Sequence, residues 1–404
     1  MNYRLLFKQK EYMKFIIANA VSRLGDSIDA IAFTWLVYEK TGSASWSAII
    51  FGLNKLPTIF LQPFLGVLGD LFDRKQMILL SHLARFLSVC LIIYWLYIDN
   101  ISPVYLAIFT LLISTFEAIN MPASSAFILE ILDEDYYAYG NSFSSTLVTI
   151  CELIGTCVAG VIIGILGIKF AFYLDATAFL LTIFIESRIN VVKKEKKTSE
   201  SDSYSDRLHG GITYIKQHKF MLNFIILAVL VNAFYVPLSA LQAPIVEEMF
   251  HENSSFLSFM NISNMAGLLA GAYLMPKIFV KYNVNKIVFT CLFIAGICVI
   301  VFSFGYLCST SISKYIFVGI IMSLLGLFIS ILNGSFNTYM MKKIDVSYMA
   351  RCSSILNACS SAAMPVSSFI ISFFVKYMHV SQILCITGIL CLLVIFVLNQ
   401  KLEF

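Results

Sequence analysis

Three charged residues lie at helical spacing inside one apolar segment near the amino terminus. Arg23, Asp26 and Asp29 fall within residues 15–38, where most other side chains are hydrophobic or small. An α-helix turns 100° per residue, so it places these three side chains on one face, within an arc of about 120°. Carboxyl and guanidinium groups in this arrangement can exchange protons, bind a polar molecule or neutralise one another. The spacing alone leaves all three roles open.

Such charges need partners if the segment crosses a membrane. Each charged residue at the centre of a membrane helix costs about 2.5 to 3.5 kcal/mol on insertion scales, whereas a strongly apolar residue contributes about 0.3 to 0.6 kcal/mol. Comparison of depth within the apolar segments predicts that Arg23 meets Glu117 and that Asp29 meets Lys55. Arg85 lies at the depth of Glu117, and its long side chain can alternatively reach the membrane surface.

Glu152 lies at the midpoint of the apolar segment 141–166, and the sequence fixes no cation beside it. Burial favours the neutral form of a carboxyl group, which is the condition for loading and releasing protons. Ionisable residues inside a membrane are functional by default. The candidate proton-coupling or substrate-cavity residues are therefore Asp26, Asp29, Glu117, Glu152, Arg23 and Lys55. The alternative is a set of structural ion pairs that neutralise one another.

The composition indicates an integral membrane protein. Of the 404 residues, 59% are hydrophobic and 13% are charged, with a mean hydropathy of +0.83, whereas about a quarter of the residues in a soluble protein are charged. A membrane helix needs about 20 apolar residues, and windows of this length favour helices over the short alternating strands of a barrel. We predict an all-α fold with twelve spans, at 15–38, 47–69, 77–98, 103–125, 141–166, 168–187, 220–243, 255–276, 287–308, 314–338, 352–376 and 379–399.

The distribution of Lys and Arg predicts the orientation of the chain. With both termini on the cytoplasmic side, twenty-one of the 28 Lys and Arg residues fall in cytoplasmic segments, four in outer loops and three inside the spans. We therefore expect a multi-pass protein of the cell membrane, with the first apolar segment retained as a span rather than cleaved as a signal peptide. The net charge of +4 reflects this asymmetry, and we expect no nucleic-acid partner.

The longest hydrophilic stretch divides the chain into two sets of six spans. Residues 188–211 are rich in Lys, Glu, Ser and Asp, which is typical of a flexible linker, and an amphipathic helix is predicted just after Arg207. We expect an amino-terminal six-helix bundle at 1–187, a cytoplasmic linker at 188–219 and a carboxy-terminal six-helix bundle at 220–404. Residues 120–145 and 333–358 have similar layouts, which favours the parallel repeats of one large class of secondary transporters.

Two further patterns distinguish the halves. Gly155, Gly160 and Gly164 in the fifth span have the spacing of close helix packing. Spans seven to twelve carry no internal Asp or Glu in the sequence and instead contain asparagines that either contact substrate or bridge helices, namely Asn232, Asn261, Asn264, Asn333, Asn337 and Asn357. The titratable groups are therefore predicted to act in the first half.

The segment GVLGDLFDRKQ, residues 66–76, resembles the signature loop of the major facilitator superfamily, which runs Gly-x-Leu-x-Asp-Arg-x-Gly-Arg-Lys. The matching positions are Gly66, Leu68, Asp70, Arg74 and Lys75, whereas Leu71 and Asp73 depart from the pattern. The Phe-Asp-Arg-Lys ending, together with RLGDSIDAIAFTWLVYEKTGSA, MPASSAF and YLDATAF elsewhere, is similar to the branch of macrolide-efflux proteins and enterobactin-type siderophore exporters. The resemblance implies two six-helix bundles in a pseudo-two-fold arrangement and transport of the drug:proton antiporter type.

The resemblance also implies a conformational latch formed by Gly66, Asp70, Arg74 and Lys75. Asp70 would meet the cytoplasmic start of the eleventh span and stabilise the outward-facing state, while Arg74 and Lys75 would hold Asp70 and the lipid phosphates. The alternative is that the two cations only enforce the topology. Asp175, which belongs to the sixth-span pattern of the branch, is interpreted as structural.

These features favour a secondary transporter. We predict a proton-coupled exporter of a small organic molecule, a drug such as a macrolide or a siderophore-like metabolite, that works by alternating access. The sequence has no ATP-binding motif, so a proton or sodium gradient must supply the energy. Two alternatives remain: an exporter of siderophores, metallophores or peptides rather than drugs, and a lysophospholipid or lipid flippase on the same fold.

An enzyme is disfavoured, because the five histidines are scattered and the sequence contains no nucleophile or metal-ligand constellation. We therefore expect no catalytic residues, no metal site and no cofactor. The expected partners are a small-molecule substrate, protons and the lipid bilayer, and we expect a monomer. The excess of Lys over Arg, with abundant Ile and Asn, is typical of a bacterial source.

Overall fold

The structure is a computed structural model that describes residues 6–71, 73–98, 101–133, 136–190, 213–344 and 346–399. Within these ranges the chain forms twelve helices of 20 residues or more, one for each predicted span. Eight of them are long and apolar enough to cross a bilayer by length and composition. The first long helix is not among the eight, because Arg23, Asp26 and Asp29 lie near its centre. The prediction of an all-α fold is confirmed.

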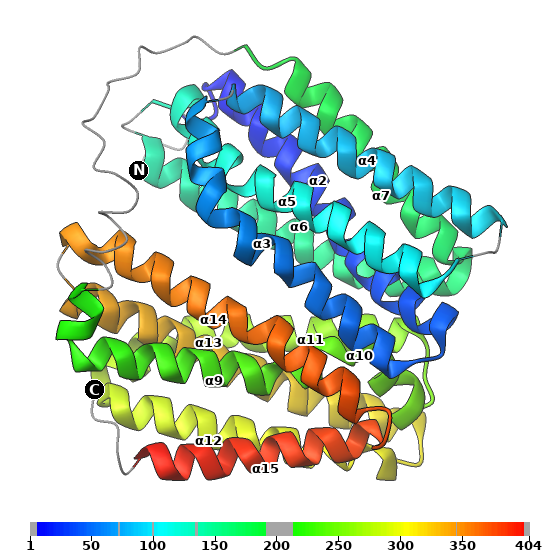
Figure 1. Cartoon of the computed structure of the whole chain (residues 1–404), viewed down its shortest axis with the longest axis vertical. Coiled ribbons are helices and arrows are strands. Elements are labelled where there is room, and N and C mark those ends of the chain that lie inside the picture. Colours follow the sequence, from blue (N-terminus) through cyan, green and yellow to red (C-terminus); the bar gives the residue numbers. More distant parts are fainter. Residues whose placement is uncertain are drawn as a thin grey trace. The chain divides into compact units, whose positions relative to one another are not determined.

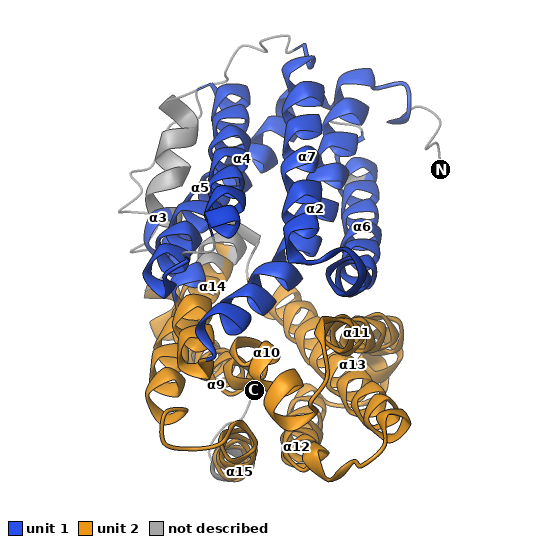
Figure 2. Cartoon of the chain, turned by 90° about the vertical axis from the view of Figure 1, so that its right-hand side faces the viewer, with its two compact units in different colours: residues 1–42, 53–197 blue, residues 43–52, 198–404 orange. Residues whose placement is uncertain are grey.

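The chain forms two compact units, which Figure 2 shows in separate colours. Unit 1 comprises residues 1–42 and 53–197, and unit 2 comprises residues 43–52 and 198–404. The predicted domain boundaries at 188 and 220 adjoin residues 191–212, which lie outside the described residues, so that division stays a prediction. Of the amphipathic helix predicted after Arg207, residues 213–217 are helical.

Within each unit the long helices lie side by side (Figure 1). The helices of unit 1 are α2 (Lys10–Thr41), most of α3 (Ala44–Leu71), α4 (Arg74–Ile98), α5 (Pro103–Ile131), α6 (Tyr137–Leu166) and α7 (Ile168–Ser187). The long helices of unit 2 are α9 (Lys219–Ala240), α11 (Ser254–Lys281), α12 (Val284–Ser303), α13 (Ser311–Lys343), α14 (Val346–Phe374) and α15 (Val380–Asn399). Unit 2 also contains the short elements α10 (Gln242–Pro244), η2 (Ile245–Met249) and η3 (Gly305–Leu307).

Helix α2 contacts α5, α6 and α7, so it occupies a central place in unit 1. A Cβ atom at Gly25 would lie 2.7 Å from both the Cβ of Ala178 and Oδ1 of Asp175, and a Cβ at Gly155 would lie 2.8 Å from the carbonyl oxygen of Leu24. A side chain at either position would clash, so glycine allows α6 and α7 to approach α2 closely. Gly155 therefore has the packing role that its spacing predicted.

Helices α4 and α7 bury polar faces within unit 1. Helix α4 contacts α5 and α7, and α7 also contacts α2. The buried residues of α7 include Asp175, Phe179, Thr182 and Glu186, spaced by three or four residues and therefore aligned along one side. This side of α7 carries ionisable groups into the interior of unit 1.

In unit 2 the core is almost entirely apolar. Phe224, Val288 and Leu332 belong to a cluster built from α9, α12, α13 and α15. The first residues of α3 pack in this unit, where the Ser45 hydroxyl donates to the carbonyl of Ser372 at 2.8 Å and the Ser368 hydroxyl donates to the carbonyl of Ala48.

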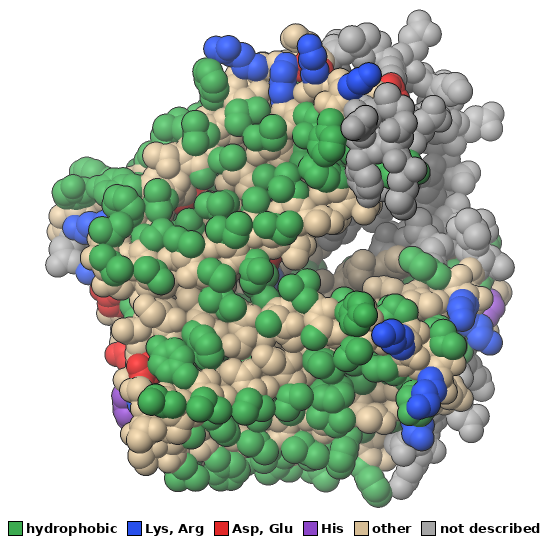
Figure 3. Space-filling model, turned by 180° about the vertical axis from the view of Figure 1, so that it is seen from behind, with side chains coloured by type: hydrophobic (Ala, Val, Ile, Leu, Met, Phe, Trp, Pro, Cys, Tyr) green, Lys and Arg blue, Asp and Glu red, His purple; other side chains and the backbone are tan. Residues whose placement is uncertain are grey.

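Large hydrophobic side chains are exposed along the sides of the helices (Figure 3). Ile165 is 77% exposed, and Tyr97 and Phe396 are each 68% exposed. On the face shown in Figure 3, the Lys and Arg side chains gather mainly toward the edges. An apolar surface of this extent is expected of a protein embedded in lipid.

Candidate functional site

Seven ionisable residues inside unit 1 form a group that we call the charge cluster: Arg23, Asp26 and Asp29 on α2, Arg85 on α4, Glu117 on α5, Glu152 on α6 and Asp175 on α7. Each charge interacts electrostatically with at least one other member. Five helices therefore contribute to a single polar region around α2.

Arg23 pairs with Glu152 rather than with Glu117. Its Nη2 donates to Oε2 of Glu152 at 2.9 Å and its Nε donates to the same oxygen at 3.3 Å. The two side chains are 38% and 37% exposed, so this pair faces open space. The physical reason for the partner is the close approach of α6 at Gly155, one helical turn from Glu152 and beside Leu24. Glu117 lies within electrostatic reach of Arg23.

Asp26 pairs with Arg85 in a much more buried setting. Nη2 of Arg85 donates to Oδ1 of Asp26 at 2.6 Å, and the two side chains are 7% and 19% exposed. The guanidinium carbon of Arg85 lies 4.6 Å from the centre of the Phe179 ring on α7. Arg85 therefore points into unit 1 and does not reach the membrane surface, because a carboxylate and an aromatic face hold it inside.

Asp29 and Asp175 have incomplete hydrogen bonding. Among the described residues, Oδ1 of Asp29 and Oδ1 of Asp175 are buried and have no hydrogen-bond partner. Asp175 is 1% exposed. The predicted pair of Asp29 with Lys55 stays a prediction. The charges of Asp26, Arg85, Glu117 and Asp175 interact with Asp29.

The charge cluster has more acids than bases. In the part of unit 1 that the structure describes, its five carboxyl groups face two guanidinium groups, and Lys55 would bring the cations to three. A buried carboxylate without a cation is costly, and such groups neutralise by taking up a proton. The excess therefore favours a proton on at least one carboxyl group.

The signature loop is described only in part. Gly66 and Asp70 lie in α3, but their side chains lie outside the described residues. Nη1 of Arg74 donates to Oε1 of Glu130 at 2.8 Å and to the carbonyl of Ala126 at 3.2 Å. Arg74 thus ties the start of α4 to the end of α5, and sequence reasoning did not identify Glu130 as its partner.

Lys75 and Lys14 cap the carboxy-terminal end of α7. Nζ of Lys75 donates to the carbonyls of Ser187 and Ile189, each at 2.8 Å, and Nζ of Lys14 donates to the carbonyl of Arg188 at 3.0 Å. These bonds satisfy carbonyls that a helix end leaves without partners, and cations are favourable at this end of the helix dipole. Lys75 therefore has a structural role inside unit 1, whatever else it contacts.

Glu11 completes this end of unit 1, ahead of the first predicted span. Nζ of Lys14 donates to its Oε1 at 2.8 Å, and the backbone amide of Asn190 donates to its Oε2 at 2.7 Å. Burial by itself would raise the pKa of Glu11, but the hydrogen bonds from Lys14 and Asn190 hold it below its ordinary value. Glu11 therefore links α2 to the segment after α7 as a carboxylate.

Sequence reasoning missed a second buried group in unit 1. His82 on α4 and Glu186 on α7 lie 3.5 Å apart, Nε2 to Oε1, and their side chains are 1% and 2% exposed. The available signal was spacing: His82 lies one turn before Arg85, and Glu186 continues the line of Asp175 and Phe179 along α7.

In unit 2 three of the six asparagines singled out from the sequence bond to protein groups. Asn264 donates to the carbonyl of Met322 on α13 at 3.4 Å, Asn261 and Gln242 exchange hydrogen bonds at 3.3 Å, and Asn232 donates to the carbonyl of Ala228 at 2.9 Å. These three residues bridge elements or bond within their own helix. This supports a structural role for them rather than contact with substrate.

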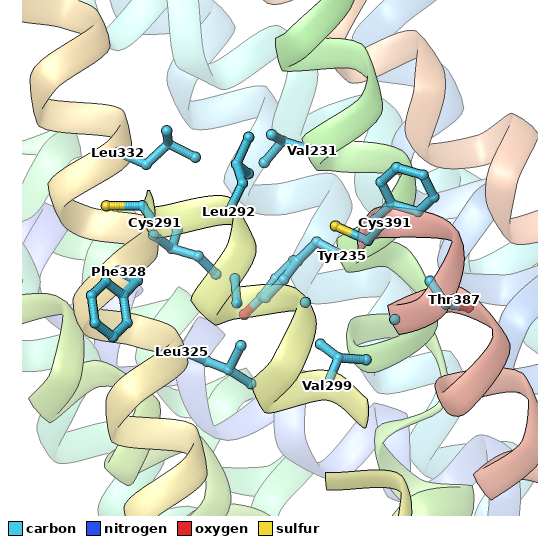
Figure 4. Close-up of a pocket in the computed structure, with 15 residues that line it drawn as sticks. Val231, Tyr235, Cys291, Leu292, Val299, Leu325, Phe328, Leu332, Thr387 and Cys391 are labelled. Carbon is cyan, nitrogen blue, oxygen red and sulfur yellow. The ribbon is translucent and has the colours of Figure 1, made fainter. Parts of the chain in front are cut away.

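Unit 2 also has an apolar pocket between α9, α12, α13 and α15 (Figure 4). Its lining includes Val231, Leu292 and Phe328, with Tyr235 and Thr387 as the polar side chains. The thiol-bearing residues Cys291 and Cys391 also line it. The pocket suits an apolar group, in contrast to the charge cluster of unit 1.

Comparison with known proteins identifies the family. The macrolide efflux protein A of Streptococcus pyogenes is 24% identical over 383 residues, which cover 93% of this chain and 92% of that protein. The MFS-type transporter YkuC of Bacillus subtilis (strain 168) is 24% identical over 316 residues, 74% of this chain and 72% of that protein. The crystal structure of the nucleoside transporter NupG shares the fold, with a TM-score of 0.79 at 11% identity over 97% of this chain and 100% of that chain. Residues 15–368 match the family model described as Major Facilitator Superfamily. Because that match covers most of a chain with twelve long helices, the protein is a multi-pass membrane transporter that belongs to the Major Facilitator Superfamily.

Proposed function

We propose that this transporter is a proton-coupled exporter of a small organic molecule and acts by alternating access in the plasma membrane of a bacterial cell. The observation that carries the proposal is the charge cluster, in which five carboxyl groups meet two guanidinium groups among the described residues and Oδ1 of Asp29 is buried without a hydrogen-bond partner. The macrolide efflux protein among its relatives supports export as the direction. The family membership supports transport rather than an enzymatic reaction.

In this mechanism protons and substrate act on the same conformational equilibrium. Protonation of a carboxyl group from outside favours one state, and loading of substrate from the cytoplasm favours the other. We assign proton binding to Asp29, with Asp175 beside it, because Oδ1 of each is buried and has no hydrogen-bond partner among the described residues. We assign contact with the polar part of the cargo to Arg23 and Glu152, whose side chains are more than a third exposed.

The latch at Gly66 and Asp70 belongs to the same proposal. Asp70 meets the cytoplasmic start of the eleventh span and stabilises the outward-facing state, while Arg74 and Lys75 keep the adjoining ends of α4, α5 and α7 together. Replacement of Asp70 by Asn is expected to slow transport while substrate binding persists. Unchanged transport by this variant would remove the latch from the mechanism.

Both termini are proposed to be cytoplasmic and the working unit to be a monomer. The lysines at the end of α7, Lys14 and Lys75, then lie at the inner membrane surface, as the positive-inside rule requires.

The cargo class has two candidates within export. A cluster with both charge signs suits a polar or zwitterionic molecule such as a siderophore, metallophore or peptide, while the macrolide efflux relative supports a drug. Metabolite profiling of a knockout strain together with a drug-susceptibility panel separates them. Accumulation of an endogenous metabolite identifies natural cargo, and drug sensitivity alone identifies a drug pump.

A lipid flippase is the second candidate function, and the apolar pocket of unit 2 is the observation that favours it. A fluorescent lysophospholipid in proteoliposomes tests this alternative: movement between leaflets that requires the protein supports it, and movement at the protein-free rate excludes it.

Proton coupling is tested in everted membrane vesicles with a radiolabelled macrolide as the probe. We expect uptake into the vesicles to stop when a protonophore collapses the proton gradient. Uptake that continues unchanged without the gradient would contradict the mechanism.

A further inference from the structure

A second group of ionisable side chains lies inside unit 1, outside the charge cluster. It consists of His82 on α4, Glu186 on α7, and Asn120 and Ser124 on α5. Nε2 of His82 lies 3.5 Å from Oε1 of Glu186 and 3.1 Å from Nδ2 of Asn120. The Ser124 hydroxyl donates to Oδ1 of Asn120 at 2.6 Å. We call this group the His82–Glu186 site.

The site is buried and its polar atoms are incompletely bonded. Among the described residues, both carboxyl oxygens of Glu186 and Nδ1 of His82 have no hydrogen-bond partner. Glu186 also lies in the last turn of α7, at the negative end of the helix dipole, where a carboxylate is disfavoured. A lone carboxylate at this place would be costly.

These conditions restrict the number of protons in the site. An imidazolium beside a carboxylate and a neutral imidazole beside a carboxylic acid both have zero net charge, and each state contains one exchangeable proton. With no such proton the site has a net negative charge, and with two it has a net positive charge, both of which burial opposes. One proton held by either Glu186 or His82 is therefore the state in which the site has zero net charge.

Asn120 accommodates both positions of the proton. Its Nδ2 faces Nε2 of His82, which is the arrangement for a neutral imidazole that accepts a hydrogen bond. A rotated amide would present Oδ1 to a protonated Nε2, and the Ser124 hydroxyl can accept from the amide as well as donate to it. The Asn120 amide, supported by Ser124, can thus hydrogen-bond to the imidazole whether Nε2 is protonated or not.

The site adjoins the charge cluster. His82 lies one helical turn from Arg85, whose guanidinium pairs with Asp26. The Phe179 ring contacts both residues of α4, with its centre 6.0 Å from the His82 ring centre and 4.6 Å from the Arg85 guanidinium carbon. On the other side, Glu186 is followed directly by the carbonyls that Lys75 and Lys14 cap.

Helices α4 and α7 and the helices packed against them carry further charged residues. They are Arg74, Lys75 and Arg85 on α4, Lys169 and Asp175 on α7, Glu117 and Glu130 on α5, Glu152 on α6, and Lys10, Glu11, Lys14, Arg23, Asp26, Asp29, Glu39 and Lys40 on α2. Of these, Arg85 is the cation one turn from His82, so a change in its pairing acts on the imidazole first.

We infer that His82 and Glu186 form a second proton-binding site, which stores one proton between the charge cluster and the cytoplasmic end of unit 1. That a proton moves from the charge cluster toward the cytoplasm rests on the proposed function. The binding of the proton does not rest on it. When the ion pair between Asp26 and Arg85 breaks, the unpaired guanidinium repels an imidazolium at His82. The proton then moves to Glu186. The position of this proton therefore depends on the pairing of Arg85 in the charge cluster.

Spectroscopy on the purified protein in lipid tests the site without any transported molecule. Nitrogen NMR of isotope-labelled histidine, with the His82 signal assigned by its loss in His82→Gln, reports the imidazole. Infrared absorption of the carboxylic acid group, assigned by its loss in Glu186→Gln, reports the carboxyl group. At neutral pH we expect the two signals together to account for one proton. A neutral His82 beside an ionised Glu186, or two protonated groups, would overturn the inference.

The link to the cluster is tested with two matched variants. Asp26→Asn removes the carboxylate that pairs with Arg85 of α4, and Glu130→Gln removes the one that pairs with Arg74 of the same helix. We expect Asp26→Asn to raise the ratio of neutral to protonated His82 by about tenfold, and Glu130→Gln to leave it unchanged. Equal ratios in the two variants would overturn the link. Because neither measurement uses transport, failure of the exporter proposal and failure of the site give different results.

Discussion

At the scale of single residues, Asp29 is the group to which the proposed mechanism assigns proton binding. Its Oδ1 is buried without a donor among the described residues, whereas Asp26 and Glu152 each accept from an arginine at 2.6 and 2.9 Å. A paired carboxylate resists protonation because the proton must displace a cation. The three carboxyl groups therefore have different tasks.

Replacement of Asp29 by Asn is expected to remove the pH dependence of export and to lower proton-driven transport, within the 5- to 150-fold range typical of coupling energies. Glu152→Gln is expected to weaken substrate affinity while the pH dependence remains. Initial rates of macrolide uptake into everted vesicles over a pH series measure both. A pH profile that survives in Asp29→Asn and disappears in Glu152→Gln would reverse these assignments.

Glu11 provides a residue-scale prediction for stability. Because the pKa of Glu11 is lowered in the folded protein, the unfolded state binds the proton more readily. The stabilisation is therefore complete above the ordinary value of 4.5 and is lost as the pH falls through the lower folded pKa. Glu11→Gln is expected to destabilise the protein at pH 7 by about 0.5 kcal/mol.

Thermal unfolding across pH measures this effect. The difference in melting temperature between the wild type and Glu11→Gln is expected to shrink as the pH falls through the folded pKa of Glu11. A difference that stays constant into acid would show that the hydrogen bonds of the Glu11 carboxylate do not contribute.

At the scale of elements, the geometry of the charge cluster depends on how closely α6 and α7 approach α2. Gly25 and Gly155 provide that approach, and Arg23 meets Glu152 one turn from the contact at Gly155. The pairing of charges is therefore a consequence of helix packing.

Gly155→Leu is expected to destabilise unit 1 by about 1 to 3 kcal/mol, because the new side chain would meet the backbone carbonyl of Leu24. Gly164→Leu on the same helix is the control, since Gly164 is exposed. Comparison of the melting temperatures of the two variants provides the measurement. Equal melting temperatures would contradict the close contact of α2 and α6.

Particular elements explain what the sequence predicts well. Each of the twelve apolar windows corresponds to one long helix, because a bilayer demands about 20 apolar residues per span regardless of neighbours. The face of α2 that carries Arg23, Asp26 and Asp29 follows from the helical period alone.

The partners of these residues did not follow from the sequence. Depth along a helix gives the height of Arg23, but not which neighbour faces it, and so Glu117 was predicted where Glu152 is found. The burial of Arg85, His82 and Glu186 could not be predicted for the same reason, because it depends on how α4 and α7 are rotated toward each other.

At the scale of the whole molecule, the two units differ in chemistry. The charge cluster and the His82–Glu186 site lie in unit 1, whereas unit 2 contains an apolar pocket and asparagines bonded to other protein groups. We propose that unit 1 binds protons and that unit 2 contacts the apolar part of a cargo.

The proposed orientation predicts which surface a membrane-impermeant reagent can reach. A single cysteine introduced at Lys40, in an otherwise cysteine-free protein, is expected to react in intact cells, whereas one at Asp133 is expected to react only in everted vesicles. The opposite pattern would place both termini outside.

Simultaneous measurement of substrate and proton movement tests the central claim most directly. Purified protein in proteoliposomes is given a proton gradient, a radiolabelled macrolide and an internal pH-sensitive dye. Proton-coupled export predicts that macrolide and protons move in opposite directions through the wild type and that Asp29→Asn slows both movements about 5- to 150-fold. Macrolide transport by the wild type with no accompanying movement of protons would contradict it.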